Sequence, residues 1–143
     1  RRAGSNPVLT SEAATSRLAT LSHCARNLCQ NRICFAHGGG SFAFWLGRLE
    51  NAWRRRPDVV GTSEHSPSHY LGRFSVDSVV FDERALRLLV DTLGADRVMA
   101  GSDYPYPLGE RPVGAVLTRS DFLTPAQRTL ISRTNAERFL ARS

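Results

Sequence analysis

The stretch RVMAGSDYPYPLGE, residues 97–110, has the pattern of a strand that ends at an acid. Residues 98–100 form a short apolar run, which is typical of a buried strand in a parallel sheet. A Gly–Ser pair interrupts the run, Asp103 follows, and Pro105 and Pro107 prevent the next residues from pairing as a central strand. This pattern fits a strand end of an α/β barrel, where catalytic side chains collect. An aspartate that caps a helix or begins a turn fits the local pattern equally well.

Strands and helices alternate along the chain on either side of this stretch. Apolar runs predict three strands, at 32–37, 74–80 and 97–102. The segments 41–56 and 82–94 between them have helical periodicity. Because a strand, a crossover helix and a second strand form a right-handed parallel unit, we expect three adjacent parallel strands with helices packed on one face.

Capping residues mark where the predicted helices begin and end. Asp82 is a good N-cap and Gly94 a good stop for the second helix. Thr124 and Asn135 are predicted caps of helices in the tail. The first thirty residues have helix-forming composition but only a thin apolar stripe, so they predict little.

Length and composition limit the fold. With 143 residues, the chain can form one domain with a core, but it is too short for a complete eight-stranded barrel. The fractions of hydrophobic residues (41%) and charged residues (22%) are those of a globular protein rather than a disordered one. The sequence has neither an apolar run of membrane-spanning length nor the apolar core of a signal peptide.

The charge and the cysteines indicate a cytoplasmic protein that does not bind nucleic acid. All 19 basic residues are arginine, whereas phosphate-binding surfaces usually use lysine as well, so the net charge of +6 indicates biased composition. Cys24, Cys29 and Cys34 match neither a zinc ribbon nor a disulfide framework, and Cys34 lies in an apolar run as a buried thiol would. Reduced cysteines without an export signal favour the cytoplasm.

Three residues on consecutive predicted strands could carry chemistry. His37 begins a His–Gly–Gly–Gly run where the first strand meets its helix, Asp77 lies in the second strand, and Asp103 ends the third. Glycines let the backbone approach a ligand closely, although a strand-end histidine can also be satisfied by neighbouring backbone. Because parallel strands align their carboxyl ends, His37 and Asp103 should share a cleft, suited to metal ligation or to acid–base work.

Other candidate residues lie outside the strands. In helix 41–56, Arg48 and Phe44 project away from the apolar face, as a solvated surface or a subunit interface would. His65 and His69 are four residues apart, but Pro67 between them prevents a helical metal-binding pair, and we interpret them as loop residues.

Three segments, residues 33–53, 70–110 and 135–140, resemble the carboxy-terminal part of zinc-dependent decarboxylases in the amidohydrolase superfamily. The similarity runs from about residue 32 to residue 143, and residues 1–31 form a poorly matching helical segment. The joint occurrence of the His–Gly–Gly–Gly run and GSDYPYPLGE is specific for one group of these decarboxylases. The resemblance implies an α/β fold, namely the carboxy-terminal portion of a (β/α)8 TIM barrel, incomplete on its own.

The resemblance also implies roles for individual residues. Asp103 would ligate a catalytic Zn²⁺, and His37 would be the acid–base histidine that activates the metal-bound water. Arg48 would bind a substrate carboxylate in the neighbouring subunit of a homodimer, and Tyr106 would lie near the substrate. The implied partners are a small carboxylate substrate and a second copy of the chain, and neither nucleic acid nor a membrane.

The sequence departs from this group in its metal ligands. The group's His-x-His pair and its third histidine have no counterpart here, and one ligand cannot hold a zinc that needs three or four. A related decarboxylase of aromatic acids and a non-catalytic module that pairs through the Arg48 face therefore stay as alternatives. In a partial barrel the uncovered side of the sheet should be unusually apolar, and burial of Phe35, Val79 and Val98 within the chain would count against a fragment.

Overall fold

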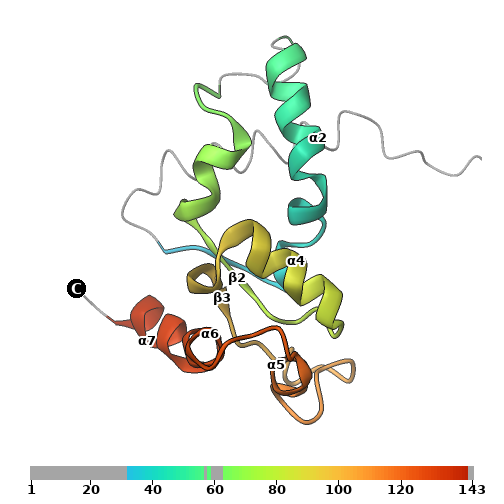
Figure 1. Cartoon of the computed structure of the whole chain (residues 1–143), viewed down its shortest axis with the longest axis vertical. Helices are drawn as coiled ribbons and strands as arrows, with labels where there is room; N and C mark the ends of the chain where they lie inside the picture. Colours follow the sequence, from blue (N-terminus) through green and yellow to red (C-terminus); the bar gives the residue numbers. More distant parts are fainter. Residues whose placement is uncertain (1–31, 57, 59–62, 142–143) are drawn as a thin grey trace, which may run out of the picture. The chain divides into compact units, whose positions relative to one another are not determined.

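The computed structural model describes residues 32–56, 58 and 63–141 (Figure 1). The described residues divide into two compact units, a smaller one within residues 46–70 and a larger one within residues 32–45 and 71–141. The poorly matching segment 1–31 and the cysteines Cys24 and Cys29 lie outside the described residues.

The larger unit contains a three-stranded parallel sheet, as predicted. Its strands are β1 (Cys34–Phe35), β2 (Ser75–Asp77) and β3 (Val98–Met99), in the order β1-β2-β3. All three are shorter than expected, and the second ends early because residues 78–80 leave the ladder in a turn. In that turn the backbone N–H of Val80 donates to the carbonyl of Ser78 at 2.8 Å.

Helices occupy the segments between and after the strands. In chain order they are η1 (His37–Gly39), α2 (Phe42–Arg55), η2 (Pro67–Arg73), α4 (Glu83–Leu93), η3 (Ala95–Arg97), α5 (Ala115–Arg119), α6 (Pro125–Thr129), the π-helical η4 (Leu130–Thr134) and α7 (Asn135–Leu140). Of the helices in the described residues, none is long and apolar enough to cross a membrane.

Helix α4 supplies much of the core of the larger unit. Its buried side chains are Leu86, Leu89, Val90 and Leu93, which belong to one hydrophobic cluster with Val76 and Val98 of the sheet. As predicted, the Asp82 side chain caps the helix, accepting hydrogen bonds from the backbone of Arg84 and Ala85. Gly94 ends it with a φ of 91°, which favours glycine.

The tail confirms one predicted cap and corrects the other. Thr124 forms a capping box with Gln127 at the start of α6. Asn135, however, has helical torsions and is not the N-cap of α7, a position that Thr134 occupies. Its buried Nδ2 donates to the carbonyls of Ala95 and Val98, both at 2.8 Å, so it ties the tail to the start of β3.

We expected the uncovered face of the sheet to be unusually apolar, and the structure does not show this. By register, Phe35, Val76 and Val98 share one face, and the latter two belong to the core cluster with α4. Val79 and Val98 are buried within the unit, but Phe35 is only half-buried, so the burial of all three that would count against a fragment is not observed. Cys34 faces the other side and is exposed, so the prediction of a buried thiol is wrong.

The open face is in fact mixed in character. It carries the half-buried polar residues Ser75 and Asp77 beside the buried Met99. Exposed apolar side chains gather instead in the loop after β3, where Tyr104 is 87% exposed and Leu108 is 83% exposed.

The smaller unit is held together by contacts from α2. The Glu50 carboxylate accepts a hydrogen bond from the backbone of Ser68 at 2.7 Å, and the Trp53 indole donates to the carbonyl of Ser63 at 3.4 Å. His65 lies in the loop and His69 in η2, and their rings stack with 4.0 Å between centroids. Phe44, in the larger unit's part of α2, and Arg48 are both exposed, as predicted.

Candidate functional site

The sheet brings His37 and Asp103 together at one end, as the topology predicted. His37 follows β1 and Asp103 follows β3, and His37 Nε2 lies 3.5 Å from Asp103 Oδ1. The histidine side chain is 64% exposed and the aspartate 26%. The pair therefore spans the carboxyl end of β2 and stays accessible to a small molecule.

Both residues have a backbone conformation that residues other than glycine rarely adopt. The φ angle is 56° at His37 and 59° at Asp103, in the left-handed region. Such torsions cost about 1–3 kcal/mol per residue, persist only where the surrounding structure imposes them, and cluster at functional sites. Phe81 shares this torsion with a φ of 54°, so a left-handed non-glycine residue follows each of the three strands.

Asp77 positions the His37 segment. Its Oδ1 accepts hydrogen bonds from the backbone N–H groups of Gly38 at 2.9 Å and Val79 at 3.1 Å. Gly38 itself has no room for a side chain, because an added Cβ would lie 2.7 Å from both Leu89 and Val80. The carboxylate and the close packing together fix the backbone at Gly38, directly after His37.

The loop that carries Asp103 closes on itself. The carbonyl of Asp103 accepts from the backbone of Tyr106 at 2.9 Å, and the carbonyl of Ser102 accepts from Glu110 at 2.9 Å. Gly109 is packed so tightly in this loop that an added Cβ would lie 2.7 Å from the Ser102 carbonyl oxygen. The loop is thus held by its own backbone.

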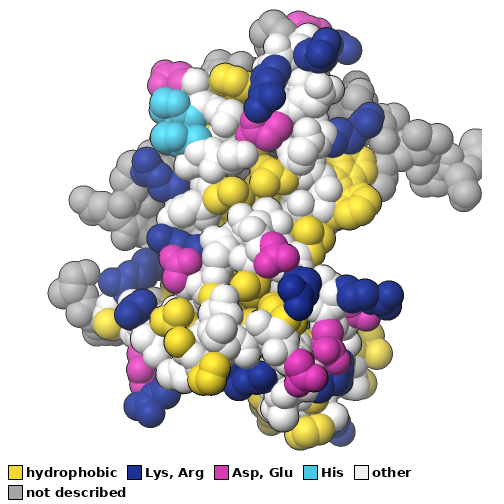
Figure 2. Space-filling view, viewed as in Figure 1, with side chains coloured by type: hydrophobic (Ala, Val, Ile, Leu, Met, Phe, Trp, Pro, Cys, Tyr) yellow, Lys and Arg dark blue, Asp and Glu magenta, His cyan; other side chains and the backbone are white. Residues whose placement is uncertain are grey.

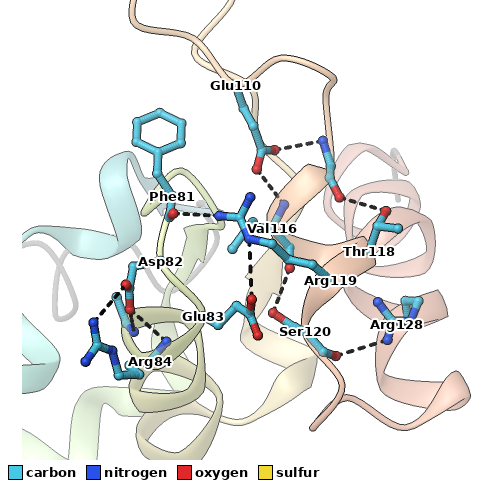
Figure 3. Close-up of polar contacts among 12 residues, drawn as sticks. Phe81, Asp82, Glu83, Arg84, Glu110, Val116, Thr118, Arg119, Ser120 and Arg128 are labelled. Atoms are coloured by element: carbon cyan, nitrogen blue, oxygen red, sulfur yellow. Dashed lines mark hydrogen bonds and ion pairs between the residues drawn. The ribbon is translucent and has the colours of Figure 1, made fainter.

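Side chains fasten this loop and the loop after β2 to the helices (Figure 3). The buried Glu110 carboxylate accepts from the backbone of Gly114 at 2.7 Å and of Val116 at 2.6 Å, at the start of α5. Arg119 of α5 donates to the carbonyl of Phe81 at 2.7 Å and lies 3.5 Å from the Glu83 carboxylate (Figure 3). We did not predict the positioning role of Glu110, because no local motif marks it.

Cys34, in the strand that leads to His37, has a clearly shifted pKa. Desolvation, and then the negative charge of Asp77, raise the pKa of this thiol from 9.0 to about 11. The thiol therefore stays protonated near neutral pH, so Cys34 is not an activated nucleophile.

The remaining predicted site residues are not brought onto the pair by the structure. Tyr106 belongs to the Asp103 loop, and its side chain is 65% exposed. Arg48 belongs to the smaller unit, so its place relative to His37 stays a prediction. In the described part of the chain, no group of three or more His, Cys, Asp or Glu side chains could hold a metal ion. His37 and Asp103 are therefore at most part of a metal site.

Comparisons with known proteins identify the family and the fold. The model of the amidohydrolase family matches residues 8–142. Two curated relatives are named 2-amino-3-carboxymuconate-6-semialdehyde decarboxylase: that of Dictyostelium discoideum is 47% identical over 87 residues, and that of Caenorhabditis elegans 42% over 87 residues. Each match covers 60% of this chain, but only 24% and 22% of the respective relative.

Solved structures share the fold. The 5-carboxyvanillate decarboxylase of Sphingomonas paucimobilis aligns with a TM-score of 0.73 and 26% identity, over 91% of this chain and 39% of that one. The enzyme of the same name from Novosphingobium aromaticivorans, solved with manganese, aligns with a TM-score of 0.70 and 24% identity, over 90% of this chain and 38% of that one. The three strands thus correspond to part of a TIM barrel, and the chain spans about a quarter of the curated relatives' length.

Proposed function

Because the chain belongs to the amidohydrolase family, we propose that it is the carboxy-terminal part of a metal-dependent decarboxylase. The observation that carries the proposal is the contact between His37 and Asp103 across the joined strand ends. Catalytic side chains of TIM-barrel enzymes lie at this end of the strands. The left-handed backbone at both residues supports the same assignment.

The proposed substrate is 2-amino-3-carboxymuconate 6-semialdehyde, an intermediate of tryptophan catabolism by the kynurenine pathway. It is supported by the names of the two curated relatives, which are 47% and 42% identical to this chain. The proposed metal is zinc, and the proposed assembly is a homodimer. A decarboxylase of aromatic acids is the second candidate, favoured by the solved 5-carboxyvanillate decarboxylase that aligns over 91% of the chain.

The proposed chemistry of His37 is proton transfer. In decarboxylation the bond from carbon to carboxylate breaks, carbon dioxide leaves, and the carbon takes up a proton. His37 is the acid–base group at the strand ends that can supply that proton, and its Nε2 lies 3.5 Å from the Asp103 carboxylate. The exposed imidazole leaves space for a substrate on its outer side.

The proposed role of Arg48 is to hold a substrate carboxylate through its guanidinium fork. In a homodimer this group would act in the neighbouring subunit's site, which fits its exposed position on α2. Tyr106 would provide an aromatic surface beside the substrate, from the loop that carries Asp103.

The described residues do not fit a zinc site by themselves. Zinc takes three or four protein ligands, and only Asp103 is assigned as one. We therefore propose that Asp103 contributes one ligand to a site whose histidines would come from a longer chain. On this basis the 143-residue chain alone should bind less than one equivalent of zinc and release no carbon dioxide. Turnover by this piece alone would overturn that expectation.

A chimera tests the roles of the two residues. Residues 32–141 would replace the corresponding carboxy-terminal segment of the Dictyostelium discoideum relative, which matches this chain over 87 residues, and metal content and carbon dioxide release would be measured. Asparagine is the substitution of choice, since it tolerates left-handed backbone better than alanine. His37→Asn should retain metal and lower the turnover number by about 10²–10⁴. Asp103→Asn should lower metal content and turnover together.

The control for the chimera is Asp91→Asn, on the exposed face of α4 and remote from the strand ends. It should leave both readings unchanged. Loss of metal in His37→Asn, or full metal content with normal turnover in Asp103→Asn, would show that the two roles are assigned wrongly.

A further inference from the structure

A second site lies at the opposite end of the sheet from His37 and Asp103. A cavity of about 280 Å³ opens at the amino ends of the strands, where Ile33 precedes β1, Ser75 begins β2 and Arg97 precedes β3. All its lining residues belong to the larger unit. The proposed decarboxylase chemistry uses none of them.

The cavity is strongly basic. Arg32, Arg73, Arg97 and Arg138 line it, against a single acid, Asp96. The four arginines come from four different parts of the fold: the residues before β1, the end of η2, the end of η3, and α7. The fold therefore brings together basic side chains that are far apart in the sequence. Figure 2 shows basic side chains gathered beside α7 with an acidic side chain among them.

Two of the four guanidinium groups are already engaged. Arg32 donates through Nη1 to the carbonyls of Arg138 and Phe139, both at 2.7 Å, and of Ala141. Arg97 pairs with Asp96 at 3.3 Å. Within the described residues, the side chains of Arg73 and Arg138 have neither a hydrogen bond nor an ion pair to another residue. Their donors are thus available to a ligand.

The floor of the cavity is rigid and polar. Asn135 is 5% exposed and is fixed by its two hydrogen bonds to the carbonyls of Ala95 and Val98. Ser75 adds a hydroxyl, and the buried ring of Phe74 adds an apolar wall. The arginines therefore surround a preformed depression rather than a flat surface.

From this arrangement we propose that the cavity binds a phosphate group, either as inorganic phosphate or as a small phosphate monoester. Guanidinium forks match the geometry of phosphate oxygens and form charge-assisted hydrogen bonds with them. The excess of four arginines over one aspartate fits a dianion better than a monocarboxylate. The site is separate from the decarboxylase site, so either assignment can fail without the other.

The test uses inorganic phosphate and the 143-residue chain. Binding would be measured by calorimetric titration and by the rise in melting temperature, at constant ionic strength set with sodium chloride. We expect saturable binding of one phosphate, and weaker binding of acetate. Arg73→Gln and Arg138→Gln should each weaken phosphate binding by about tenfold, since each removes a charge-assisted contact.

The matched control is Arg84→Gln, which removes the same charge from an exposed position on α4 outside the cavity. It should leave phosphate affinity unchanged, and circular dichroism of each variant would verify its fold. Equal weakening in Arg84→Gln, or no saturable binding by the folded parent chain, would overturn the proposal. Comparison of phosphate with a phosphate monoester then distinguishes the two sources of the group, since only the ester would gain affinity from the Phe74 wall.

Discussion

Replacing Gly38 by alanine should destabilise the larger unit through two separable effects. The first is torsional, because φ is +61° at this position and a left-handed residue with a Cβ costs about 1–2 kcal/mol. The second is steric, because the new Cβ would lie 2.7 Å from side-chain atoms of both Leu89 and Val80. Overpacking of this kind costs about 1–3 kcal/mol. We therefore expect Gly38→Ala to lower the free energy of unfolding by about 2–5 kcal/mol.

Gly114→Ala separates the two effects. Gly114 has a φ of +80°, also left-handed, but an added Cβ there has nothing within 4 Å. This variant should cost only the torsional part, about 1–2 kcal/mol. Urea unfolding followed by circular dichroism measures both variants against the parent, with the slope against urea expected to stay constant. If the two alanines cost the same, close packing around Gly38 does not hold the His37 segment.

Three further predictions concern other polar groups. Asn135→Ala should lower the free energy of unfolding in urea by about 2–4 kcal/mol, because two carbonyls lose their donor; Asn135→Asp should cost more, since it places an acceptor against them. Burial raises the pKa of the Glu50 carboxyl, but hydrogen bonds from Ser68 lower it, and the resulting pKa lies below 4.5. The ionised carboxylate therefore stabilises the folded state at pH values above the pKa that Glu50 has in the unfolded chain. That contribution should disappear as the pH falls through the folded pKa, as tryptophan fluorescence of the parent and of Glu50→Gln would show; an identical acid transition in both would contradict it. With the other two cysteines changed to serine, absorbance of the Cys34 thiolate should titrate near pH 11, and Asp77→Asn should lower that midpoint; an unchanged midpoint would exclude Asp77 as a cause.

The sequence is sufficient to predict the parallel sheet and the convergence of His37 and Asp103. Both follow from strand–helix alternation, because right-handed crossovers place the strand ends side by side. The caps at Asp82 and Thr124 are also local, since each side chain bonds backbone two or three residues away. Features determined over short distances are thus visible in the residue pattern.

Features determined across the fold are not visible in that pattern. Asn135 has the residue type of a cap, yet its partners are carbonyls near β3, which only the folded tail brings close. Cys34 lies in an apolar run, but register places it on the open face of the sheet. The segment after His37 is held by a contact across the sheet ends, the hydrogen bond from Gly38 to Asp77, and no local pattern indicates it.

The brevity of the strands has a consequence for self-association. In the described part of the chain, β1 and β3 each pair on one side only, so the sheet has two open edges. Long open edges invite pairing with other chains and lead to aggregation, and short edge strands are one way that natural proteins avoid it. Because β1 and β3 have two residues each, a strand of another chain could form only a few backbone hydrogen bonds with either edge. Stable pairing would need further contacts. Addition of a correct neighbour therefore depends on side-chain packing, which makes the edges selective.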